Sequence, residues 1–156
     1  MKAQASWPGF RLWTEANRGW GKAFAKMKQV LLVDDDPSQL AVRQLLLSRS
    51  GIDSQLSTEA KQALQLLRSE AGREAIGAVV TDHVMPEVDG VAFVREIRSF
   101  DPTIPVIVVS GLPDIDDAYY GLEVLVLSKP CEPEALIATI RNALTRAQGG
   151  SSYKAS

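Results

Sequence analysis

Six residues whose side chains can do polar chemistry stand at or just beyond the ends of apolar runs. They are Asp34, Asp35, Asp36, Asp82, Ser110 and Lys129. Carboxylates that lie close together repel each other, by roughly 4 kcal/mol at a separation of about 4 Å and an effective dielectric constant of about 20. If these aspartates meet in space, one of them must keep a proton or a cation must sit among them.

A cluster of this kind has a definite chemistry. Hard carboxylate oxygens suit Mg²⁺, which keeps several waters and accepts a phosphoryl oxygen. A lysine and a hydroxyl beside the ion would bind the other oxygens of a phosphoryl group. One aspartate could then act as the nucleophile and form an acyl phosphate. The residue types therefore indicate phosphoryl chemistry, provided that the fold brings them to one place.

From residue 29 onward, short apolar runs alternate with segments of helical periodicity. The expected strands are residues 30–33, 52–56, 78–81, 104–109 and 123–127. The first expected helix is capped by Asp36, begins at Pro37 and ends at Gly51. The second begins at Ser57 or Thr58 and ends at Gly72 or Gly77. The others are expected over 91–97, over 113–120 as a doubtful short helix, and from Pro133 onward. This alternation predicts a doubly wound α/β sandwich with a parallel sheet covered on both faces. Ligands of such sheets bind beyond the carboxyl ends of the strands, where the polar residues would meet.

Composition limits the classes to which the protein can belong. The chain has 156 residues, of which 46% are apolar, and this suffices for one globular domain. The single cysteine, Cys131, excludes a disulfide within the chain and favours a reducing compartment; we expect its side chain to be partly packed. The apolar runs are too short to span a bilayer. The net charge of −2 argues against a basic nucleic-acid-binding surface.

The first 28 residues differ from the rest of the chain. They carry six basic residues, one acidic residue and all three tryptophans, whereas the remainder carries eleven basic and eighteen acidic residues. This segment is interpreted as a plain upstream extension, with a docking or membrane-surface segment and a targeting peptide as alternatives. We expect an N-terminal extension over 1–28, a folded domain over 29–147 and a flexible tail over 148–156.

Four short motifs resemble those of response regulator receiver domains. They are VLLVDDDP at residues 30–37, VVTDHVMP at 79–86 followed by Asp89-Gly90, VIVVS at 106–110, and SKP at 128–130. Each motif alone is weak, but their order and separations make the resemblance strong, and it covers about residues 29–147. The resemblance implies a flavodoxin-like (βα)5 sandwich with a five-stranded parallel sheet in the order 2-1-3-4-5.

The resemblance also implies roles for individual residues. Asp82 would be the phosphoacceptor, Lys129 would pair with a phosphoryl oxygen, and Ser110 would hydrogen-bond another. The implied Mg²⁺ ligands are Asp34, Asp35, Asp82 and the backbone carbonyl of Val84. Asp36 is left out of the ligand set. His83 is expected to be a solvated loop residue rather than a metal ligand or an acid–base group.

The function that the resemblance implies is a stand-alone, cytoplasmic receiver that is phosphorylated by a sensor histidine kinase or a histidine phosphotransfer protein. It would not be an enzyme beyond promoting its own phosphorylation and dephosphorylation. It would signal through an unidentified protein target, with no nucleic-acid partner and no membrane span. Two alternatives are a phosphohydrolase similar to haloacid dehalogenases, suggested by residues 34–38, and a receiver-fold scaffold that works without phosphorylation.

Two departures from the usual receiver pattern lead to expectations. Many receivers carry an aromatic residue three positions before the lysine, where this chain has Val126, and the chain between Ser110 and Lys129 is about three residues short. We therefore expect a short or distorted fourth helix and a partner surface that differs from the usual one. Val84 and Leu112 occupy the positions that flank the attacking water in the family. Neither side chain can orient a water, so we expect the phosphorylated state to be long-lived.

Overall fold

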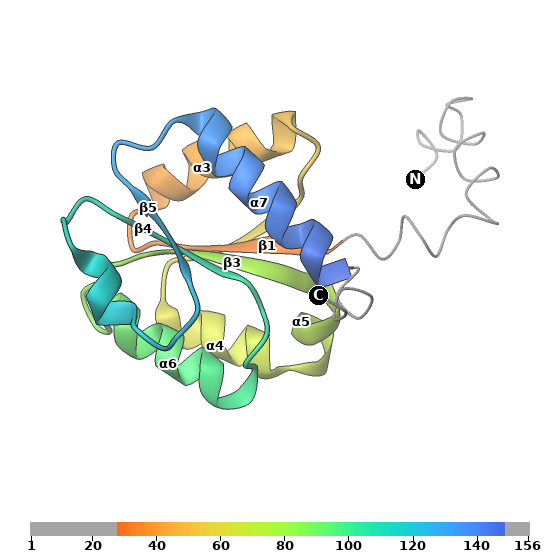
Figure 1. Ribbon diagram of the computed structural model, residues 1–156. Coiled ribbons are helices and arrows are strands. Elements are labelled where there is room, and N and C mark those ends of the chain that lie inside the picture. The colour runs from red at the N-terminus through yellow and green to blue at the C-terminus, as the bar shows by residue number, and fades with distance from the viewer. Residues whose placement is uncertain (1–27, 149–156) are drawn as a thin grey trace, which may run out of the picture.

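The computed structural model describes residues 28–148, which fold into one parallel sheet between two layers of helices (Figure 1). The strands are β1 (Gln29–Val33), β2 (Ser54–Ser57), β3 (Ile76–Asp82), β4 (Val106–Ser110) and β5 (Leu125–Ser128). Their order is β2-β1-β3-β4-β5, and all neighbouring pairs are parallel. The predicted fold class and strand order are confirmed.

The helices lie on both faces of this sheet. They are α3 (Pro37–Arg49), α4 (Ala60–Arg68), α5 (Glu70–Ala75), α6 (Gly90–Phe100), the short 3-10 helix η1 (Ile115–Tyr119) and α7 (Pro133–Gln148). Helices α3 and α7 cover one face, and α4, α5 and α6 cover the other (Figure 1). None of the helices within residues 28–148 is long and apolar enough to cross a membrane. The two predicted terminal segments fall outside this range, apart from Lys28 and Gln148.

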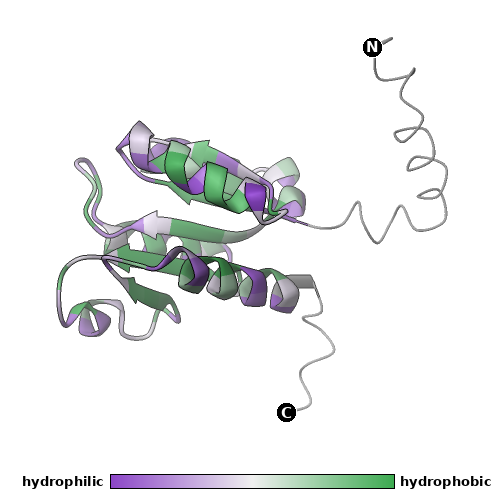
Figure 2. Cartoon of the chain, turned by 90° about the horizontal axis from the view of Figure 1, so that it is seen from above, coloured by the Kyte–Doolittle hydropathy of each residue, from purple (hydrophilic) through white to green (hydrophobic). Residues whose placement is uncertain are grey.

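The central strands are apolar on both faces because each face packs against helices. In β1, Leu31 and Val33 join the core under α4 and α6, whereas Val30 and Leu32 join the core under α3 and α7. All four side chains are fully buried. Figure 2 shows the same arrangement as hydrophobic central strands between helices that alternate between hydrophobic and hydrophilic positions. Burial on both faces explains why the apolar residues of these strands form continuous runs in the sequence and do not alternate with polar residues.

Helix α3 begins where the sequence predicts. Asp36 caps it, because its Oδ1 accepts a hydrogen bond of 2.9 Å from the Ser38 amide, and Pro37 occupies the first helical position. The helix ends at Arg49, and Gly51 follows in the left-handed region with φ 79°. The cap matters for the site, since it fixes the chain direction immediately after Asp34 and Asp35.

The segment between β2 and β3 forms two helices, α4 and α5, whereas the sequence predicts one helix that ends at a glycine. The helix is interrupted at Ser69. The Oγ of this residue accepts a hydrogen bond of 2.9 Å from the Gly72 amide and thereby caps the separate helix α5. The predicted cap at Ser57 or Thr58 is also wrong, because α4 begins at Ala60 without a side-chain cap. Gly77 lies inside β3 instead, where a Cβ atom would come within 2.7 Å of Lys28 Cβ. Close packing, not helix termination, explains that glycine.

The segment between β4 and β5 contains no regular three-turn helix. Its only helical element is η1, which follows Asp114, a residue in the left-handed region with φ 51°. Ile115 and Tyr119 of η1 are buried in the core on the α4–α6 side. The expectation of a short or distorted fourth helix is confirmed.

Candidate functional site

Three aspartates meet at the carboxyl edge of the sheet. Asp34 and Asp35 directly follow β1, and Asp82 ends the neighbouring strand β3. One carboxylate oxygen from each lies within 4.8 Å of those of the other two. Asp34 and Asp82 are only 2% and 8% exposed, whereas Asp35 is open to solvent. Together with Val84, Lys129 and neighbouring residues they line a surface cavity of about 420 Å³.

Lys129 reaches this cluster from the end of β5. Its Nζ lies 3.0 Å from Asp82 Oδ1. Its backbone amide donates a hydrogen bond of 2.8 Å to the Ser110 carbonyl, so the chain entering the loop after β5 is fixed to the end of β4. The side chain is 39% exposed, which leaves the ammonium group accessible to a ligand in the cavity.

Ser110 and Val84 lie beside the acidic cluster without joining it. Ser110 ends β4 and is buried, and its Oγ accepts a hydrogen bond of 3.0 Å from the Leu112 amide. The Ser110 hydroxyl hydrogen is not used in that bond and can be donated elsewhere. Val84 lines the cavity two residues beyond Asp82, with 61% of its surface exposed. The structure therefore gathers the predicted residues at one edge of the sheet, with the aspartates and the lysine in direct proximity.

The structure also contains a charged partner that the sequence reasoning missed. Arg43 of α3 is 7% exposed, and its guanidinium lies 3.3 Å from Asp34 Oδ2. The other oxygen of Asp34 accepts a hydrogen bond of 2.9 Å from the Asp36 amide. Arg43 stands three residues after Leu40 and four before Leu47, both buried, so a charged residue on the inner face of this helix was the available signal.

Burial is the main influence on the ionisation of Asp34. Removal from water raises the pKa of this carboxyl above its ordinary value, and the charges of Asp82 and Asp35 raise it further. The Asp36 amide and the Arg43 guanidinium act in the opposite direction. The net direction is upward because burial, together with the two neighbouring carboxylates, outweighs the amide and the guanidinium.

His83 is not the solvated residue that the sequence analysis expects. It is partly buried, and its Nδ1 lies 2.8 Å from the hydroxyl of Tyr119 on η1. The two rings meet edge to face with centroids 5.7 Å apart. Burial raises the pKa of Tyr119, and the charges of Asp89 and Asp82 add to the rise, so the phenol stays protonated. The expectation failed because the partner is 36 residues away in sequence.

Cys131 is partly buried and packs against the core formed with α3 and α7, as predicted. Burial is the largest cause of a raised pKa for its thiol, which disfavours the reactive thiolate at neutral pH. The cysteine therefore packs as a small apolar side chain beside the site.

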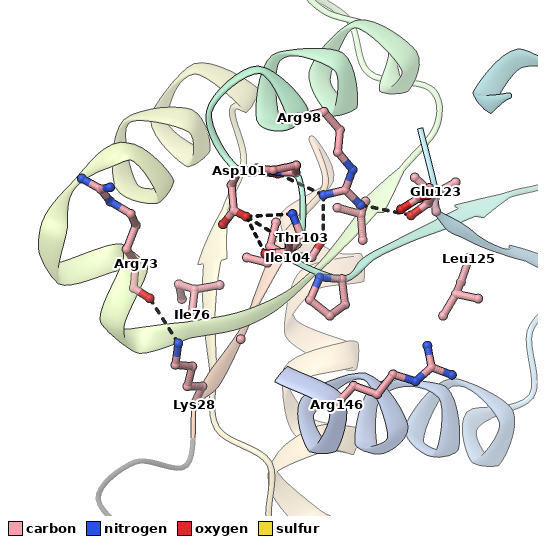
Figure 3. Close-up of a pocket in the computed structure, with 15 residues that line it drawn as sticks. Lys28, Arg73, Ile76, Arg98, Asp101, Thr103, Ile104, Glu123, Leu125 and Arg146 are labelled. Carbon is pink, nitrogen blue, oxygen red and sulfur yellow. Dashed lines mark hydrogen bonds between the residues drawn. The ribbon is translucent and has the colours of Figure 1, made fainter. Parts of the chain in front are cut away.

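A second cavity, of about 570 Å³, lies at the opposite, amino-terminal edge of the sheet (Figure 3). Four basic and two acidic residues line it, and two of the basic side chains donate to backbone carbonyls. Arg98 donates to the carbonyls of Leu122, Asp101, Ile104 and Glu123, and Lys28 donates to that of Arg73. This cavity contains none of the predicted site residues, and Arg98 acts as a structural link between two loops.

Comparison with known families decides the identity of this arrangement. The sequence profile of the response regulator receiver domain matches residues 30–141. The chain belongs to this family. Receiver domains are signalling domains of two-component response regulators. The match favours the receiver interpretation over the phosphohydrolase alternative.

Individual relatives agree with this assignment. The receiver is 32% identical over 118 residues to the transcriptional regulatory protein ZraR of Escherichia coli, covering 74% of this chain and 26% of that protein. It is 34% identical over 131 residues to the transcriptional regulatory protein PrrA of Mycobacterium bovis, covering 82% and 54% respectively. The chain thus spans between about a quarter and about half of the length of these relatives.

Solved structures show the same fold. A response regulator receiver domain protein from Clostridium thermocellum superposes with a TM-score of 0.70 at 27% identity, over 78% of this chain and 97% of that one. The signal receiver domain of an HD domain-containing protein from Pseudomonas fluorescens gives a TM-score of 0.69 at 30% identity, over 78% and 98%.

Proposed function

We propose that this receiver accepts a phosphoryl group on Asp82 from a phosphohistidine of a sensor histidine kinase or a histidine phosphotransfer protein. An Asp82 carboxylate oxygen attacks phosphorus, the phosphorus–nitrogen bond breaks, and the donor imidazole leaves with the electron pair and takes up a proton. The product is an acyl phosphate on Asp82. The modified receiver then signals through protein contacts.

The observation that carries this proposal is the position of Asp82. Its carboxylate lies beside Lys129 Nζ and the two other aspartates, at a cavity that is open to solvent. Lys129 already pairs with one oxygen at this position and is exposed enough to follow an incoming phosphoryl oxygen. The 3.0 Å contact also shields part of the repulsion between Asp82 and an anionic donor.

The acidic residues fit Mg²⁺. Asp34, Asp35 and Asp82 would hold it together with the Val84 carbonyl, and the close approach of the three carboxylates supports this assignment. The bound ion would neutralise the charge of the phosphoryl oxygens during transfer. Ser110 can donate its hydroxyl hydrogen to a further oxygen once the group is in place.

The test is incubation of the full chain with a small acyl phosphate, followed by intact mass. We expect the wild type to gain one phosphoryl group with Mg²⁺ and none with a chelator. Asp82→Asn should gain none, and Asp35→Ala should be strongly impaired because it lacks an exposed ligand. Asp53→Asn removes an exposed carboxylate just before β2 and serves as the matched control, which should behave as the wild type.

Three outcomes would contradict the proposal. Normal modification of Asp82→Asn would exclude Asp82 as the acceptor, and normal modification of Asp35→Ala with Mg²⁺ would exclude the ligand assignment. A wild type that stays unmodified under all conditions would support the scaffold alternative.

A further inference from the structure

The acidic cluster contains two internal cations. Lys129 pairs with Asp82 at 3.0 Å, and Arg43 pairs with Asp34 at 3.3 Å. Asp35 is in no ion pair within residues 28–148. The proposed function uses Lys129 to bind the phosphoryl group, but it gives Arg43 no role.

Arg43 differs from Lys129 in its burial. The Arg43 side chain is 9% exposed and that of Asp34 is 3%, whereas the side chain of Lys129 is 39% exposed. Charges that are removed from water interact more strongly, and salt screens them less. Lys129 can move away when a ligand enters, but the burial of Arg43 restricts the movement of its side chain.

Both oxygens of Asp34 already have partners. Oδ1 accepts from the Asp36 amide at 2.9 Å, and Oδ2 faces Arg43. A divalent cation that binds Asp34 must therefore share an oxygen with one of these donors. It must also approach the positive charge of Arg43, which is paired with the same carboxylate.

Arg43 is not the only group that orients Asp34. The Asp36 amide and the burial of the carboxylate already fix its position. The 3.3 Å separation is also longer than the 2.7–2.9 Å that is usual for strong charge-assisted hydrogen bonds. The main effect of the guanidinium on a neighbouring cation is therefore electrostatic repulsion.

We propose that Arg43 competes with the divalent cation for Asp34 and so keeps the affinity of the acidic cluster for Mg²⁺ low. This inference rests on the proposed function, which places the ion among Asp34, Asp35 and Asp82. In this scheme Arg43 acts on the ion through Asp34 and is not itself a ligand. Because of this competition, the occupancy of the site would follow the surrounding concentration of Mg²⁺, and the site would not be saturated.

The test is a titration of the full chain with Mn²⁺, followed by the electron paramagnetic resonance signal of the free ion at fixed pH and ionic strength. Arg43→Met keeps most of the side-chain volume and removes the charge, and we expect it to bind Mn²⁺ about tenfold more tightly than the wild type. Arg43→Lys keeps the charge and should stay within about threefold of the wild type. Arg49→Met removes an exposed charge from the same helix and should change nothing.

An Arg43→Met protein that is folded by circular dichroism but binds Mn²⁺ no more tightly than the wild type would overturn the inference. Weaker binding would do the same, because it would show that Arg43 supports the ligand. If Arg43→Met does not fold, Arg43→Gln removes the charge but keeps an amide donor for Asp34, and the same prediction applies to it.

Failure of the proposed function gives a different result in the same titration. A wild type without Mn²⁺ affinity would overturn both the metal site and the inference, and so would an Asp35→Asn variant that binds as tightly as the wild type. A third result would show that only the role of Arg43 is wrong. In that case the wild type binds Mn²⁺, Asp35→Asn does not bind it, and Arg43→Met binds it no more tightly than the wild type.

Discussion

The hydroxyl oxygen of Tyr119 lies 2.8 Å from Nδ1 of His83, the residue that follows Asp82. Tyr119 ends η1, the only helical element between β4 and β5. His83 is held to the sheet by its amide, which donates to the Val109 carbonyl, and its own carbonyl accepts from the Gly90 amide. The hydrogen bond therefore connects the loop after the proposed phosphoacceptor to the segment that replaces a regular fourth helix.

Loss of this hydrogen bond should reduce stability. Tyr119→Phe leaves the partly buried Nδ1 of His83 without its partner, and we expect the free energy of unfolding in urea to fall by about 1 kcal/mol. Tyr120→Phe is the matched control, since that neighbouring side chain is 89% exposed and should lose nothing measurable. Equal stability of the two variants would mean that the Tyr119–His83 contact does not hold in solution.

The same tyrosine should make stability depend on alkaline pH. Because the pKa of Tyr119 is raised in the folded state, the folded protein keeps the phenol proton at pH values where the unfolded chain has lost it. The contribution of this proton is fully present below the ordinary tyrosine pKa of about 10 and is lost as the pH rises above it. Above about pH 10 the stability of the wild type should fall more steeply than that of Tyr119→Phe. Parallel curves for the two proteins would contradict the assigned pKa shift.

We predict that only glycine fits at position 90, because a larger residue would collide with the Tyr119 hydroxyl. A Cβ atom at this position would collide with Tyr119 Oη and lie 3.0 Å from His83 Cα. We expect Gly90→Ala to cost roughly 1–3 kcal/mol of stability, as overpacking does. The cost should shrink when Gly90→Ala is combined with Tyr119→Phe, because the colliding oxygen is then absent. Gly111→Ala, where the added Cβ would meet Lys129 Cβ at an ordinary 3.8 Å, is the control. An unchanged cost in the double variant would place the strain elsewhere.

Val84 and Leu112 should make the phosphorylated state long-lived. Both side chains are apolar and exposed, at 61% and 52%, and in the family these positions flank the path of the water that hydrolyses the acyl phosphate. Val84→Asn and Leu112→Glu can orient that water, and we expect each to speed the decay of the phosphorylated protein in excess Mg²⁺ by up to about tenfold. Val42→Asn changes an equally exposed valine on α3 and should leave the decay rate as it is. Decay that is no slower in the wild type than in the polar variants would refute this prediction.

Local patterns were sufficient to predict the sheet and the acidic edge. Strands such as β1 and β3 are continuous apolar runs because both their faces are buried, and a run that ends in aspartate places that aspartate at the carboxyl edge. The cap at Asp36 depends only on the next two residues, so it was also predictable. The short segment around η1 was predictable only by comparing the chain length between Ser110 and Lys129 with that of other receiver domains.

Contacts between distant residues were not predictable in the same way. The boundary at Ser69 is a separate case: the contact is local, since the Gly72 amide donates to Ser69 Oγ three residues earlier, but the glycine suggested a helix end instead of a helix start. His83 and Tyr119 are 36 residues apart, and nothing in either local sequence indicates the other. Arg43 on the buried face of α3 is the exception, because a charge in an apolar stripe implies a buried partner.

The central claim is that Asp82 is the one residue that accepts the phosphoryl group. The most direct measurement is to treat the full chain with a small acyl phosphate and Mg²⁺, reduce the product with borohydride, and map the peptides by mass spectrometry. Reduction converts a phosphorylated aspartate to homoserine and thereby records its position. We predict homoserine at position 82 and at no other aspartate of the cluster. Homoserine at Asp34 or Asp35, or stable phosphate on His83 with an intact Asp82, would contradict the proposed function.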